Sequence, residues 1–71
     1  MKRLRSPLSG TLRIYLVKVG DLVQPDTEVA VIDSMKMEIP VLAEYAGRVS
    51  ALLADPAAMI DEGQPLLELE S

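Results

Sequence analysis

The residues able to do chemistry in this 71-residue chain are few, because it contains neither cysteine nor histidine. These absences exclude disulfides, thiolate nucleophiles, imidazole acid–base catalysis and nearly all zinc sites. The serines have no histidine partner for a hydrolase triad, and no glycine-rich loop precedes a helical pattern. Asp61 and Glu62 are adjacent, so in a strand they would point to opposite faces, and we interpret them as a solvated turn. The sequence therefore predicts a domain with no catalytic residues and no metal site of its own.

The one segment that stands out is Asp33-Ser34-Met35-Lys36-Met37. Turns usually carry small polar residues, whereas methionine thioethers are soft apolar contacts suited to the surface of a partner protein. One interpretation is therefore a recognition segment with Lys36 at its centre. In the other, both methionines plug the ends of the core, and Lys36 is merely exposed or paired with a neighbouring acid. Spacing alone leaves both interpretations open.

The elements that must position this segment are predicted to be β-strands. The chain holds 22 branched aliphatic residues, no Phe and no Trp, and five Pro and four Gly divide it into short pieces. A shift of 37 residues aligns 10–34 with 47–71 without a gap and keeps the apolar positions in register. We expect one domain over residues 1–71, an all-β flattened barrel or sandwich. Its two four-stranded antiparallel sheets would be related by an internal pseudo-twofold repeat.

Alternation of apolar residues predicts which side chains face the core. Short strands are expected near 3–6, 22–24, 37–42 and 59–61. Continuing the alternation past Ile32 would bury Lys36, so a turn is expected at about Met35. The segment lacks the usual hairpin residues, however, so residues 28–42 could also form one long strand. Where the first half has Gly20-Asp21 the second has alanines, and alanine resists positive φ. The expected inward residues are Leu12, Ile14 and Leu16 in the first half and Val49, Ala51 and Leu53 in the second.

Charge is unevenly distributed along the chain. Residues 1–18 carry +5 and residues 19–71 carry −9, for a net charge of −4. The basic arm could be a nucleic-acid or membrane patch, but we favour a solvated edge strand that keeps its cations outward. An acidic chain with two aromatic residues is a poor nucleic-acid binder, and it has neither a membrane-spanning apolar run nor an apolar signal core. We expect a cytoplasmic protein.

The segment around Lys36 resembles the attachment motif of biotin carboxyl carrier domains, which centres on Met-Lys-Met between two quasi-symmetric halves. The resemblance runs from 6–10 through 19–21 to 63–66 and is closest to the small single-domain biotin/lipoyl attachment proteins. It implies that Lys36 bears covalent biotin and that Met35, Met37 and Asp33 belong to the recognition motif. Ser34 stands where many members have alanine. Lipoyl domains share the fold but usually lack the methionines, which favours biotin.

The resemblance also implies a function and its partners. A biotin protein ligase would modify Lys36, and the ligase or solvent would remove the proton from its amine, since the chain offers no base. The carrier would then move a carboxyl group between biotin carboxylase and carboxyltransferase, and the transferase would choose the acceptor. The alternatives are a lipoyl or dual biotin/lipoyl carrier and an unmodified protein-interaction module. Because Met1 runs directly into the first strand, we expect a free-standing protein.

Overall fold

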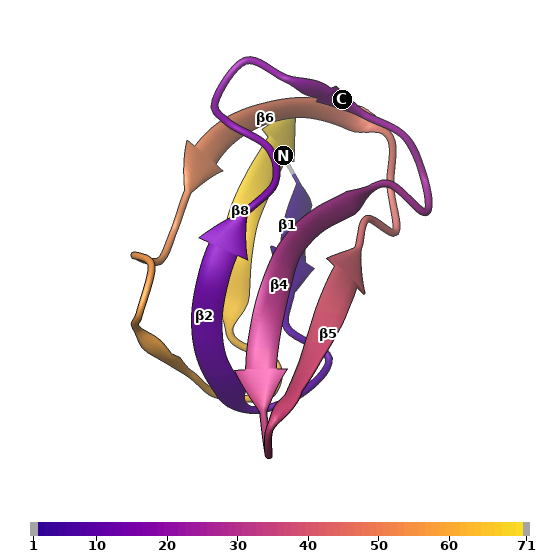
Figure 1. Cartoon of the computed structure of the whole chain (residues 1–71). Coiled ribbons are helices and arrows are strands. Elements are labelled where there is room, and N and C mark those ends of the chain that lie inside the picture. Colours follow the sequence, from indigo (N-terminus) through magenta and orange to yellow (C-terminus); the bar gives the residue numbers. More distant parts are fainter. Residues whose placement is uncertain (1, 71) are drawn as a thin grey trace.

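The computed structural model describes residues 2–70, which form eight β-strands in two layers (Figure 1). One sheet has the strand order β1-β8-β6-β3 and the other β5-β4-β2-β7, with every neighbouring pair antiparallel. These two four-stranded sheets confirm the predicted fold class. The strands are β1 (Lys2–Arg5), β2 (Gly10–Tyr15), β3 (Leu22–Val23), β4 (Glu28–Ser34), β5 (Met37–Leu42), β6 (Gly47–Leu52), β7 (Met59–Ile60) and β8 (Pro65–Glu70).

The internal repeat organises both sheets. Moving 37 residues along the chain takes β1 to β5, β2 to β6, β3 to β7 and β4 to β8, so the order of one sheet becomes the order of the other. Each sheet contains two strands from each half, and the halves are therefore interleaved. The turn between β4 and β5 lies at one end of the barrel, while β1 starts and β8 finishes towards the other (Figure 1).

The core between the sheets is built from aliphatic side chains of both halves. Thin layers of Leu, Val and Ile fill this space without large rings, as the composition predicts. The buried residues are Leu4, Leu12, Val23, Val29, Ala30, Ile32, Val41, Ala43, Val49, Ile60, Leu66, Leu67 and Leu69.

A β-bulge in each half changes the predicted facing of four residues. The register slips between Leu12 and Ile14 in β2, and between Val49 and Ala51 in β6. A bulge adds one residue and reverses the alternation beyond it. Leu12 and Val49 are buried as expected. The expectation was wrong for Ile14 and Leu16, which are 49% and 48% exposed, and for Leu53, which is 40% exposed.

Ala51 lies just beyond the second bulge, and it too departs from the expected facing, being half-buried rather than fully buried. The reversal places Tyr15 and Val17 against the core in the first half and Leu52 in the second. The two bulges lie 37 residues apart, so the repeat extends to this irregularity.

The turns also repeat, including their unusual backbone angles. Gly20 has φ 99° and its counterpart Ala57 has φ 74°, so the alanine adopts the positive φ that its side chain disfavours. Equivalent hydrogen bonds hold both turns: the Gly20 N–H donates to the Val49 carbonyl, and the Ala57 N–H donates to the Leu12 carbonyl. Each half therefore fixes a turn of the other.

The basic arm divides between two strands with different surroundings. Strand β1 is an edge strand with its cations exposed, and Lys2 Nζ lies 4.3 Å from the centre of the Tyr45 ring. For Arg13 the edge-strand interpretation was wrong, because β2 lies between β4 and β7 inside the other sheet. No helix within residues 2–70 is long and apolar enough to cross a membrane.

Candidate functional site at the β4–β5 turn

The connection between β4 and β5 is a two-residue hairpin turn made of Met35 and Lys36. Ser34 pairs with Met37 across the hairpin, and Asp33 pairs with Glu38. Met35 has φ 49° and Lys36 has φ 69°. Two consecutive positive φ values are what a type I′ turn requires, and Asn-Gly normally supplies them because other residues are strained there. The structure confirms the turn expected at Met35 but builds it from two residues that favour other conformations.

The side chains of this turn project into solvent. Met35 is 93% exposed and Met37 is 63% exposed, and Lys36 between them is also exposed. Large apolar side chains in such positions gain nothing from the core. The interpretation in which the two methionines plug the ends of the core is therefore wrong.

The acids beside the turn pair with an arginine from the neighbouring strand. Arg13 Nε lies 3.0 Å from Glu38 Oε2, and Arg13 Nη1 lies 3.8 Å from Asp33 Oδ2. Among residues 2–70 none of the ion pairs includes Lys36. The suggestion that Lys36 is a structural group paired with Asp33 or Glu38 is thus also wrong, and its amine stands free at the tip of the hairpin.

The five residues singled out from the sequence lie together because they are consecutive. Asp33 and Ser34 close β4 and are half-buried, while Met35, Lys36 and Met37 form the exposed tip. Sequence reasoning missed Arg13, which lies twenty residues before the segment and reaches it only through the pairing of β2 with β4. Its repeat counterpart is Ser50, so the repeat gave no signal for an arginine at this bulge.

The arrangement is suited to acylation of a primary amine from outside. Lys36 is the only basic residue between Lys18 and Arg48, and strained backbone holds it at an end of the barrel. Within residues 2–70 there is no pocket and no group of three acidic side chains suited to a metal ion. A group attached at this turn would therefore be carried outside the fold.

Comparison with known proteins places the chain in a family. Residues 2–69 match the family model described as "Biotin-requiring enzyme", the biotin/lipoyl family. The chain belongs to the biotin/lipoyl attachment domains, in which biotin or lipoate is held covalently and which are typically non-catalytic carriers. A biotin/lipoyl attachment protein of Bacillus subtilis is 39% identical over 64 residues, which cover 90% of this chain and 88% of that protein.

Solved structures agree with this assignment. The urea carboxylase of Kluyveromyces lactis superposes with a TM-score of 0.90 and 28% identity, over 97% of this chain but 6% of that one. A lipoyl domain of the 2-oxoglutarate dehydrogenase complex from Azotobacter vinelandii superposes with a TM-score of 0.71 and 25% identity, over 89% of this chain and 80% of that one. The chain is thus related both to carrier domains of biotin-dependent carboxylases and to lipoyl domains.

Proposed function

We propose that this protein is a biotin carboxyl carrier, with biotin attached to Lys36 through an amide bond. The observation that supports it best is the geometry of the β4–β5 turn. There an unpaired lysine stands between two exposed methionines, in a type I′ turn that Asn-Gly would form without strain. As part of the same proposal, the domain occupies residues 1–71 and works in the cytoplasm.

Each residue of the turn has a role in this proposal. In acylation, the Lys36 ammonium loses a proton to the ligase or to solvent. Its nitrogen then forms an amide with the activated carboxyl group, and adenylate leaves. Arg13 occupies both nearby carboxylates, so the amine does not have to leave an ion pair first. Met35 and Met37 offer apolar contacts to the ligase, while Ser34 and Asp33 end β4 and fix where the turn begins.

The attached group performs its chemistry on partner enzymes. The ureido ring of biotin supplies the carboxyl-carrying chemistry, and the protein supplies tethering and docking. Tethering raises the local concentration of the carried group at biotin carboxylase and then at carboxyltransferase. The high structural similarity to the urea carboxylase supports partners of this kind.

The second candidate is a lipoyl or dual carrier, supported by the likeness to the lipoyl domain and to the biotin/lipoyl attachment protein. Incubating the purified protein with biotin ligase, with lipoate ligase and with neither, each with MgATP and the matching acid, separates the candidates by intact mass. We expect one biotinyl increment in the first reaction. A lipoyl increment alone would support the second candidate, and no increment with either ligase would leave an unmodified interaction module.

A further inference from the structure

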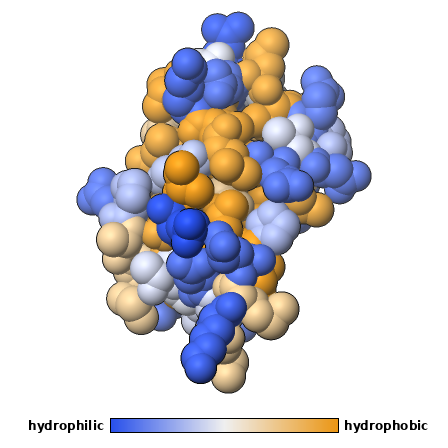
Figure 2. Space-filling view, viewed as in Figure 1, coloured by the Kyte–Doolittle hydropathy of each residue, from blue (hydrophilic) through white to orange (hydrophobic). Residues whose placement is uncertain are grey.

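The outer face of the sheet that carries Lys36 bears a strip of apolar side chains that are exposed or partly exposed. Cross-strand register places Ile14 beside Val31 and Val31 beside Pro40 in one row. Leu16 and Leu42, 48% and 45% exposed, lie one step further from the turn. These five residues are called the apolar strip below. Figure 2 shows hydrophobic surface over β2, β4 and β5, with a strongly hydrophilic group nearer the turn.

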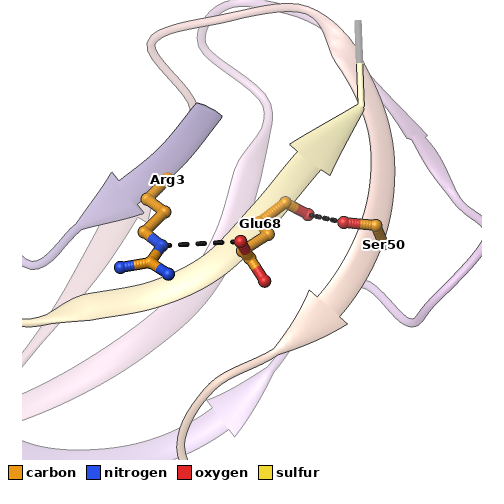
Figure 3. Close-up of polar contacts among 3 residues, drawn as sticks. All are labelled: Arg3, Ser50 and Glu68. Atoms are coloured by element: carbon orange, nitrogen blue, oxygen red, sulfur yellow. Dashed lines mark hydrogen bonds and ion pairs between the residues drawn. The ribbon is translucent and has the colours of Figure 1, made fainter. Parts of the chain in front are cut away.

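The other sheet shows that the fold does not require this strip. At the positions related by the repeat, Val31 is replaced by Glu68, Pro40 by Arg3 and Leu42 by Arg5. Arg3 Nε and Glu68 Oε2 lie 3.4 Å apart on that outer face (Figure 3). A solvated sheet face normally carries such polar residues. The outer faces of the two sheets thus differ at these three positions, which are apolar on the sheet bearing Lys36 and charged on the other, whereas Ile14 and Leu16 correspond to Ala51 and Leu53.

The apolar strip lies within reach of any enzyme that acts on the bare amine. Pro40 is four residues from Lys36 along β5, a distance of about 13 Å at the rise of an extended strand. An enzyme must bring its reacting carbon to bond distance of the Lys36 nitrogen before any arm is attached. An interface between such an enzyme and this protein would bury about 800 Å² per partner, a patch roughly 16 Å in radius. Centred on the turn, this patch would extend over the apolar strip.

The charge of this face argues against a second copy as its occupant. Acids border the strip at both ends. Glu28 lies opposite Leu42, and Asp33 and Glu38 lie towards the turn with Arg13 as their one cation. Two copies face to face would oppose these acids to each other, whereas a partner with a basic rim would complement them.

We infer that the apolar strip is the docking surface for the protein ligase that acylates Lys36, and that the ligase presents an apolar patch with a basic rim to it. This inference rests on the proposed function. It assigns to the outer face of β5-β4-β2 the recognition that the exposed turn alone is too small to provide. The opposite sheet takes no part.

A pair of double variants related by the repeat tests the inference. Leu16→Gln with Leu42→Gln makes the strip polar, and Leu53→Gln with Arg5→Gln changes the corresponding positions on the other sheet. Acylation of each purified protein by the ligase that modifies the wild-type chain is followed against carrier concentration. We expect the first pair to raise KM at least ~10-fold with kcat within about twofold, and the control pair to change KM by less than about twofold. Added salt should lower kcat/KM of the wild type, because the acidic border is screened.

Two further measurements keep a negative result interpretable. Acylation of Lys36 by a small amine-reactive ester, quantified on its peptide, should be the same in all three proteins, which shows that the turn is intact. Equal KM changes in the two double variants, or none in either, would overturn the inference. So would a wild-type dimer in sedimentation that Leu16→Gln with Leu42→Gln makes monomeric. If no ligase modifies the wild type, the proposed function fails instead.

Discussion

The two halves of the chain build the same four strands, yet they treat their strained positions differently. Both contain a bulge in the second strand and a positive φ in the following turn, at Gly20 in one half and Ala57 in the other. At Ala57 the strained backbone only closes a turn, and the equivalent turn of the first half is closed by Gly20, which adopts a positive φ without strain. At Met35 and Lys36, where the halves join, strain falls on two consecutive residues whose side chains the interior does not use. Strain on two consecutive exposed residues, which Asn-Gly would relieve, is typical of a functional position.

Removing the amine while keeping the turn should have the largest effect. Lys36→Arg preserves the charge and the long stem, but a guanidinium does not deprotonate to a useful nucleophile. We expect complete loss of ligase-dependent label in a streptavidin blot, with the free energy of unfolding changed by less than ~0.5 kcal/mol. Lys18→Arg is the matched control and should keep full label. Label that persists in the Lys36 variant and maps to Lys2 or Lys18 would contradict the assignment.

Moving the amine by one position tests whether the turn itself matters. Exchanging Met35 and Lys36 keeps the composition and an exposed amine but places it on the other strained residue. Because the two residues of the turn project differently, we expect the ligase rate to fall at least ~10-fold, equivalent to ~1.4 kcal/mol. Equal rates would show that the ligase needs only an accessible lysine.

Tyr15 is a further difference between the halves, since its repeat counterpart is Leu52. Its hydroxyl donates to the Leu66 carbonyl at 2.6 Å and accepts from the Ala54 N–H at 3.1 Å, which ties β2 to the opposite sheet. Tyr15→Phe leaves both backbone groups without this partner and should lower the free energy of unfolding by about 1–2 kcal/mol in urea titrations.

Burial, with a smaller contribution from the Asp55 charge, raises the pKa of Tyr15, while backbone hydrogen bonds from Ala54 and Leu53 oppose the shift. The folded state therefore disfavours the phenolate. The contribution of protonated Tyr15 to the free energy of unfolding is complete below the ordinary tyrosine pKa of about 10 and is lost as the pH rises through the raised pKa. Above pH ~10 the wild type should lose stability more steeply than Tyr15→Phe. Parallel pH profiles would exclude this linkage.

The smallest effect concerns the two repeated turns. Ala57→Gly relieves a left-handed alanine, which stabilises the fold by about 1–2 kcal/mol. Glycine also gives the unfolded chain more conformational freedom, which destabilises the fold by ~0.4–1 kcal/mol. We expect a net stabilisation of about 0.5 kcal/mol, visible as a raised Tm. Gly20→Ala is the reciprocal control: a Cβ there meets no atom within 4 Å, so only φ opposes it, and Tm should fall by a similar amount. Changes of the same sign in both variants would contradict the symmetry of the turns.

The repeat explains how much of the fold the sequence could predict. Its constant offset aligned apolar positions across both halves, so eight strands in two sheets followed from it. Predicted strand bounds agree with the structure to within one residue, as for β1 and β7. The bulges were not predictable, because a bulge adds a residue without changing residue types. The facing of Ile14, Leu16, Ala51 and Leu53 was therefore reversed or weakened.

The candidate site, like the fold, could be predicted from the sequence only in part. Residues 33–37 could be singled out because they are consecutive and because Met-Lys-Met is uncommon in a turn, and the resemblance to biotin carboxyl carrier domains then favoured their function. Arg13 could not, since its contact with Asp33 and Glu38 depends on the β2–β4 register beside a bulge. The positive φ of Met35 and Lys36 also had no signal, because neither residue type favours it. The need to keep Lys36 out of the core pointed to a turn there.

The most direct test is to locate the modification in the wild-type protein. The chain is co-expressed with its ligase, digested with a protease that cuts at acidic residues, and fragmented in a mass spectrometer. We predict one biotinyl increment per chain, carried entirely on Lys36 within the peptide spanning the β4–β5 turn, with Lys2 and Lys18 unmodified. An increment on Lys2 or Lys18, or one shared among the three lysines, would contradict the proposal that the strained turn defines the attachment site.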